Sequence, residues 1–209
     1  FPSLKFAKNT LYYIHDPMCS WCWAFKPTWQ KILTSLPQNL TVKYLLGGLA
    51  PDNDNPMPPE TRKLVINNWR RVQDKVPATE FNYEFWRLNT PKRSTYIACR
   101  AVISARIQNP KFERAMIDEI QYAYYLEAQN PSEEIVLFDL ADNIGLNVQA
   151  FKKDLNSPRV NNYLKKEIEF SRTMPINGFP SLVLSKNGTL TQIRINYLNA
   201  NFNINQIIA

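Results

Sequence analysis

The sequence lacks long hydrophobic runs and blocks of like charge, and both absences exclude classes of protein. No stretch of about 18 apolar residues occurs, so the sequence predicts a soluble protein with no membrane partner. The formal net charge is +7, but the basic residues are spread thinly, with no block of about five like charges. Basic character of this kind does not predict binding to nucleic acid.

Cysteine and histidine are also scarce. Three cysteines in 209 residues do not form a disulfide scaffold, which needs more of them in a shorter chain. Cys19 and Cys22 lie together in HDPMCSWCW, whereas Cys99 falls on a small-residue helical face and is interpreted as a packing residue. The three cysteines and His15, the only histidine, are four potential zinc ligands. Structural zinc sites usually have two closely spaced pairs of ligands in the sequence, and this chain has one. No metal site is therefore predicted.

The first fifty residues predict a β-α-β unit. Apolar runs over 10–15 and 40–48 are typical of strands, and helical spacing over 19–36 predicts a helix between them, kinked at Pro27. Parallel strands need such a crossover. The proline-rich segment 50–60 then ends this unit.

Helical signals dominate the middle of the chain. Helices are predicted over 60–76, 94–108, 111–128, 132–144, 148–155 and 158–170. Strand signals return at 181–185 and 190–195 around a hairpin turn, and 199–209 closes the chain as a short helix. We therefore expect an α/β unit of residues 1–50 and 158–209, interrupted by an all-helical insertion of residues 51–157.

The cysteine pair lies between the end of a predicted strand and the start of a helix. Unpaired N–H groups and the helix dipole favour an anion at that position, so the pKa of Cys19 is expected to fall from about 8.5 to roughly 3.5–7.5. Cys19 would then be a reachable nucleophile, and the more buried Cys22 would resolve its mixed disulfides. The alternative is that both cysteines are small apolar side chains.

Neighbouring residues extend this candidate site. His15 is a candidate for a nearby charge or proton shuttle, or else an ordinary strand-end residue. Asp16 would raise the thiol pKa by like-charge repulsion if it pointed inward. Trp21, beside Ser20 between the cysteines, would contribute to an exposed apolar patch for extended polypeptides.

A second motif, INGFPSLVL at 176–184, precedes the third predicted strand. A cis peptide at Pro180 would bring the backbone against the cysteine pair. Because proline donates no N–H, the backbone of Phe179 would be left to pair with an incoming extended peptide. An ordinary trans proline at a strand start is the alternative.

These residues together resemble a known family. The β-Cys-x-x-Cys-α-β order, the helical insertion and the Gly-Phe-Pro-Ser step are similar to the DsbA-like branch of the thioredoxin superfamily. HDPMCSWCW and ACRAV at 98–102 are especially similar to FrnE-like predicted protein-disulfide isomerases. The resemblance implies a thioredoxin fold with catalytic Cys19, Cys22 and cis-Pro180. It also implies that Ser20, Trp21 and Phe179 contact substrate.

The same resemblance implies a thiol–disulfide oxidoreductase or isomerase that acts on cysteine-containing polypeptides, with glutathione or a redox partner protein as further partners. The implied enzyme needs no cofactor beyond the Cys19–Cys22 disulfide. Ser20-Trp21 replaces the Pro-His dipeptide of the strongly oxidising periplasmic enzyme, so a moderate potential is expected.

Two other functions stay open on this scaffold. Glutathione-dependent transferases and 2-hydroxychromene-2-carboxylate isomerases share it, but typically use a serine or a single cysteine at the helix start. A non-catalytic polypeptide-binding chaperone would use the cleft alone. The chain begins FPSLK without an initiator methionine, so the start gives no compartment. Bacterial cytoplasm is favoured over periplasm because similar FrnE-like sequences often lack export signals.

Overall fold

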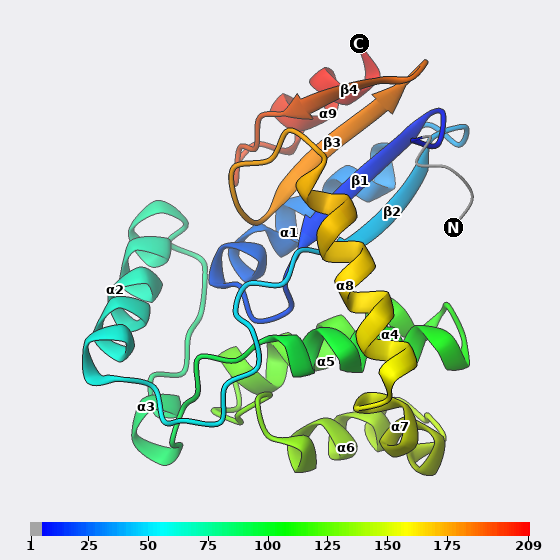
Figure 1. Cartoon of the computed structure of the whole chain (residues 1–209). Helices are drawn as coiled ribbons and strands as arrows, with labels where there is room; N and C mark the ends of the chain where they lie inside the picture. Colours follow the sequence, from blue (N-terminus) through cyan, green and yellow to red (C-terminus); the bar gives the residue numbers. More distant parts are fainter. Residues whose placement is uncertain (1–5) are drawn as a thin grey trace.

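A computed structural model describes residues 6–209, and within that range the strands form one four-stranded sheet (Figure 1). The strands are β1 (Thr10–His15), β2 (Thr41–Leu46), β3 (Ser181–Lys186) and β4 (Thr189–Ile193). Their order is β2-β1-β3-β4, with β1 parallel to β2 and antiparallel to β3, and β4 antiparallel to β3. The predicted β-α-β and β-β-α units of a thioredoxin fold are confirmed.

Helices cover both faces of this sheet (Figure 1). Side chains alternate along β1, so Leu11 and Tyr13 pack with α1 (Ser20–Ser35) and α9 (Ala200–Ile208). Tyr12 and Ile14 face the opposite side, where α8 (Pro158–Arg172) crosses in front of the sheet and leads to Met174. Burial on both sides explains why β1 is buried along its whole length and reads as a continuous apolar run.

A block of helices separates β2 from α8. It contains α2 (Pro59–Lys75), α3 (Phe85–Leu88), α4 (Tyr96–Gln108), α5 (Phe112–Tyr125), α6 (Glu134–Asn143) and α7 (Val148–Leu155). Each longer helix lies within a few residues of its predicted range. The four-residue α3 was outside the prediction because one turn is too short to show helical periodicity. Among the described helices, none is long and apolar enough to cross a membrane.

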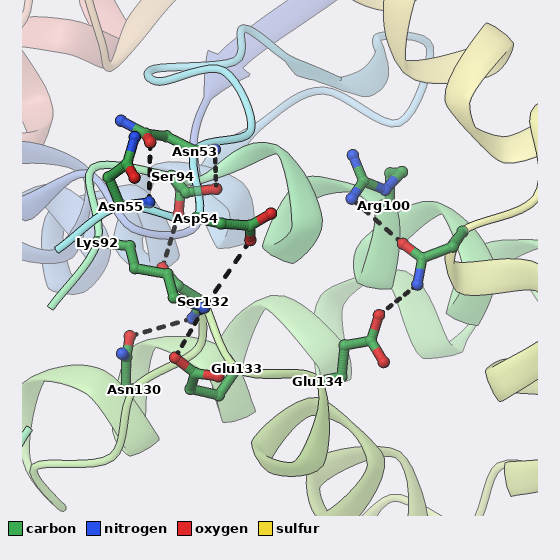
Figure 2. A network of polar contacts seen from close by, with 11 residues as sticks. Asn53, Asp54, Asn55, Lys92, Ser94, Arg100, Asn130, Ser132, Glu133 and Glu134 are labelled. Atoms are coloured by element: carbon green, nitrogen blue, oxygen red, sulfur yellow. Dashed lines mark hydrogen bonds and ion pairs between the residues drawn. The ribbon is translucent and has the colours of Figure 1, made fainter. Parts of the chain in front are cut away.

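The proline-rich connector between β2 and α2 is fastened to this helical block (Figure 2). The backbone N–H of Asn53 donates to Ser94 Oγ at 3.3 Å, and Ser132 Oγ donates to the Ser94 carbonyl at 2.6 Å. Lys92 forms ion pairs with Asp54 of the connector at 4.0 Å and with Glu133 of the helical block at 3.1 Å. The connector therefore has a defined path. The division at 50/51 and 157/158 into two domains stays a prediction.

Candidate active site

Cys19 is the residue that caps the N-terminus of α1. The turn Asp16-Pro17 ends β1, and the Cys19 N–H donates to the Asp16 carbonyl at 3.0 Å. The Cys19 side chain makes no capping hydrogen bond, and its sulfur lies at the helix end where the first-turn amides have no intrahelical partner. Cys19 is 6% exposed and Cys22 is fully buried, and both carry free thiols. Cys19 is thus less accessible than expected, and all of the exposed surface of the two cysteines belongs to it.

The two thiols have opposite pKa shifts. A hydrogen bond from the Cys22 thiol lowers the pKa of Cys19, and backbone N–H groups of Cys22 and Trp21 lower it further, against the effects of burial and of Asp16. Burial raises the pKa of Cys22 well above its usual range, and the interaction with Cys19 adds to that. The arrangement favours a thiolate on Cys19 and a protonated Cys22.

The loop before β3 brings a second segment against Cys19. The Phe179–Pro180 peptide bond is cis, as expected. In its thiol form Cys19 donates to the Phe179 carbonyl, with 3.6 Å between sulfur and oxygen. Phe179 is half-buried, and its ring lies over Gly47, where a Cβ would come within 2.0 Å of Phe179 Cε1.

The dipeptide between the cysteines is held by α2. Ser20 is 6% exposed, and its hydroxyl accepts a hydrogen bond from Asn68 Nδ2 at 2.8 Å. Trp21 is half-buried, donates from Nε1 to Asn68 Oδ1 at 3.2 Å, and packs on Tyr197 with 5.4 Å between ring centroids. The Ser20 side chain is thus engaged with α2 instead of being free for a substrate. Substrate contact by Ser20 and Trp21 stays a prediction.

Asp16 points inward, as its predicted effect on the thiol requires. It is fully buried; Oδ1 accepts from the Met18 N–H at 2.8 Å, and Oδ2 accepts from the Leu49 N–H and Thr95 Oγ1, each at 2.7 Å. Burial raises the pKa of Asp16, and these hydrogen bonds oppose the rise. When ionised, Asp16 raises the pKa of Cys19 by charge repulsion.

His15 does not supply the predicted charge. Its side chain is 1% exposed, stacks on Tyr13 at 5.2 Å and meets the edge of Tyr44 at 5.7 Å. Neither ring nitrogen has a hydrogen-bond partner among the described residues. Burial, helped by the charge of Arg106, lowers the pKa of His15 to about 3. The imidazole is therefore neutral at physiological pH, which argues against His15 as a nearby charge; a role as a proton shuttle stays a prediction.

The arrangement has known counterparts. The sequence profile of the thioredoxin family matches residues 12–201, which include Cys19, Cys22 and Pro180. The chain belongs to the thioredoxin family. This thioredoxin-family chain is similar to a proposed protein disulfide isomerase from Nitrosomonas europaea, with 27% identity, a TM-score of 0.82 and coverage of 97% of this chain and 96% of that one. It shares its fold with the cytosolic disulfide reductase DsbM from Pseudomonas aeruginosa, with 23% identity, a TM-score of 0.72 and coverage of 88% and 89%.

Curated relatives of this thioredoxin-family chain are described differently. The ClpXP adapter protein SpxH of Halalkalibacterium halodurans is 24% identical over 177 residues, which cover 83% of this chain and 57% of that protein. SpxH of Bacillus subtilis is 22% identical over 173 residues, covering 82% and 56%. The chain therefore spans a little over half the length of these curated relatives. The expected DsbA-like thioredoxin fold is confirmed, and the activity is a matter for proposal.

Two residues of the site carry no motif in the sequence. Asn68 reaches the dipeptide from α2, and Tyr13, on the α1 side of β1, interacts with the Cys22 thiol. Alternation along β1 indicates the face to which Tyr13 belongs, but it does not indicate that Cys22 lies there. Nothing in the spacing of α2 points to Asn68.

A small recess lies beside Cys22 in this thioredoxin-family chain. Cys22, Tyr13 and Tyr44 line it together with polar residues of α1 and α5, and its volume is about 40 Å³. That is room for a few water molecules at most. Within residues 6–209, no three His, Cys, Asp or Glu side chains are grouped to hold a metal ion.

Proposed function

We propose that this chain is a thiol–disulfide oxidoreductase that exchanges disulfides with cysteine-containing polypeptides. The observation that carries the proposal is the position of Cys19. It caps α1, receives a hydrogen bond from Cys22, and lies 3.6 Å from the carbonyl oxygen of Phe179. A thiolate with a second thiol behind it and a backbone carbonyl beside it is suited to this exchange.

The chemistry takes two steps. The Cys19 thiolate attacks one sulfur of a substrate disulfide, and the other substrate sulfur leaves as a thiolate that takes a proton from solvent. The Cys22 thiol then gives up its proton and attacks Cys19, so that a Cys19–Cys22 disulfide forms and the second substrate thiolate leaves. The substrate gains two electrons and the cysteine pair loses two. Glutathione or a redox partner protein returns the pair to its dithiol state.

The segment around Phe179 supports a polypeptide as the substrate. Pro180 has no N–H, and the Phe179 carbonyl lies at the thiol. An extended chain that paired with the Phe179 backbone as an added strand would run past Cys19 and present its sulfur there. The half-buried rings of Phe179 and Trp21 would contact its side chains.

We place the protein in the bacterial cytoplasm, where it would act mainly as a reductant or isomerase. The DsbM structure that shares the fold is described as a cytosolic disulfide reductase. The absence of a histidine between Cys19 and Cys22 supports a moderate potential, since one source of thiolate stabilisation is missing.

Insulin reduction tests the proposal. We expect the wild-type protein to precipitate insulin B chains in the presence of a reductant, and Cys19→Ser to be inactive. Activity that survives in Cys19→Ser would eliminate the proposed nucleophile. Glutathione conjugation to an electrophile without insulin reduction would instead favour a glutathione-dependent transferase or a chromene-carboxylate isomerase-like enzyme.

A second candidate function is that of an adapter or chaperone that binds polypeptides without redox chemistry. The observation that favours it is the description of the SpxH relatives as ClpXP adapters. Such a protein would keep its binding activity when Cys19 and Cys22 are both serine. An exchange enzyme would lose its activity in the same variant.

A further inference from the structure

Asn68 uses one amide group to hold both residues that separate the two cysteines. Its Nδ2 donates to Ser20 Oγ at 2.8 Å, and its Oδ1 accepts from Trp21 Nε1 at 3.2 Å. The donor and the acceptor of the amide are thus committed to consecutive residues. The contact joins α2, in the helical block, to the first turn of α1.

We propose that Asn68 is a positioning residue for the Cys19 thiolate: it fixes the Ser20–Trp21 dipeptide and so holds the first-turn amides of α1 beside the sulfur. The inference rests on the proposed function, because it gives Asn68 a part in thiol chemistry. The hydrogen bonds of Asn68 go to Ser20 and Trp21, so its proposed effect on the sulfur is indirect.

The backbone of this dipeptide matters because it stabilises the anion. The Cys22 thiol makes the largest contribution to the lowered pKa of Cys19, and the N–H groups of Cys22 and Trp21 add to it. The Trp21 N–H belongs to the peptide unit between Ser20 and Trp21, so Asn68 holds the side chains on both sides of that unit. Since the Cys19 side chain makes no capping hydrogen bond, the position of these amides is set by the geometry of the turn that Asn68 holds.

Asn68 has a rigid base in α2. The next residue, Trp69, is 1% exposed and stacks on Phe81 at 4.6 Å, with Tyr125 at 5.5 Å. The Tyr125 hydroxyl in turn donates to the Met18 carbonyl at 2.7 Å. One aromatic cluster therefore holds the chain on both sides of Cys19. Tyr125 bonds Met18, which precedes Cys19, and Asn68, next to Trp69, bonds the Ser20–Trp21 dipeptide that follows it.

The test is a titration of the Cys19 thiolate by its ultraviolet absorbance in wild type and in Asn68→Ala. Loss of the two hydrogen bonds frees Ser20 and Trp21, so we expect about threefold to tenfold less thiolate at the wild-type midpoint pH. The rate of Cys19 alkylation should fall by a similar factor. The matched control is Asn67→Ala, whose exposed side chain accepts from Arg70 and which should titrate like wild type.

A mutant cycle separates positioning from loss of structure. Ser20→Ala with Trp21→Phe removes both partners of Asn68 but keeps an aromatic ring on Tyr197. We expect this double variant to lose as much thiolate as Asn68→Ala, and the triple variant to lose no more. If circular dichroism shows that Asn68→Ala does not fold, the double variant alone provides the test. A wild-type titration in Asn68→Ala, or in the double variant, would overturn the proposal.

The same measurements distinguish this inference from the proposed function. Wild type that fails to reduce insulin, while Asn68→Ala still loses thiolate, would reject the function and keep the positioning role. Wild type that reduces insulin, while Asn68→Ala titrates normally, would reject the positioning role alone.

Discussion

The Cys19 sulfur lies 3.6 Å from the carbonyl oxygen of Phe179, although 160 positions separate the two residues. The antiparallel register of β1 and β3 brings them together, because Ile14 pairs with Ser181 and both strands lead directly into the site. A slip of one residue would turn the side chains of β3 to the opposite face, so this register is strongly specified. A substrate that bound along Phe179, as we propose, would thereby reach Cys19.

Cys22→Ser should trap substrates as mixed disulfides on Cys19. Without the Cys22 thiol, the second step of the exchange cannot occur. Mixed disulfides of Cys19 with disulfide-containing polypeptides or with glutathione should therefore accumulate. Non-reducing electrophoresis and intact mass would measure them. Adding Cys99→Ala should not change the yield, since Cys99 is fully buried. Conjugates that persist in Cys19→Ser/Cys22→Ser would show that another thiol reacts.

Gly47→Ala should impair substrate binding by displacing the Phe179 ring. The new Cβ would come within 2.0 Å of Phe179 Cε1, and the ring, as the far end of a flexible side chain, can turn away. We expect KM for a peptide disulfide to rise roughly threefold to tenfold, about 1 kcal/mol of binding, with little change in kcat. The melting temperature should stay within a few degrees of wild type.

Phe179→Ala supplies the control for that variant. In its background the added methyl group has no ring to displace, so Gly47→Ala should have no further effect on KM. An equal effect in both backgrounds would mean that Gly47 acts on the site by another route.

The fold and the cysteine pair were predictable because their signals are local. β1 is a continuous apolar run ended by Asp16-Pro17, and Cys19 follows that turn directly. The cis peptide at Pro180 was predictable for a different reason, namely a motif whose resemblance to DsbA-like proteins places it beside the cysteines.

The surroundings of the site were not predictable, since they depend on contacts between distant segments. Alternation assigns His15 to one face of β1, but its burial, with Tyr44 from β2 at its edge, and the charge of Arg106 from α4 make it neutral. Asn68 has no periodic or compositional signal, and only the packing of α2 against α1 brings it to Ser20.

Asp16→Asn should increase the thiolate on Cys19 and lower the stability of the fold. The carboxylate raises the pKa of Cys19 by repulsion, so a neutral amide should allow more thiolate at a given pH. An asparagine oxygen can replace Oδ2, but its NH2 group would face the Met18 N–H. We expect this mismatch to cost about 1–3 kcal/mol of unfolding free energy.

Absorbance titration and urea unfolding would check the two effects on that variant. Asp54→Asn is the matched control, because its side chain is fully exposed, and it should change neither quantity. Unchanged thiolate in Asp16→Asn would mean that Asp16 has only a structural role.

His15 should make the protein sensitive to acid. Burial holds the pKa of His15 at about 3 in the folded chain, against 6.5 ordinarily, so only the unfolded chain binds this proton between those values. The stabilisation is complete above about pH 6.5 and is lost as pH falls toward 3, by up to about 1.4 kcal/mol per pH unit. His15→Phe keeps a ring against Tyr13 and removes the titration. Between pH 7 and pH 4, urea unfolding should show wild type losing about 3 kcal/mol more than His15→Phe, whereas equal losses would mean that His15 accepts its proton in the folded state.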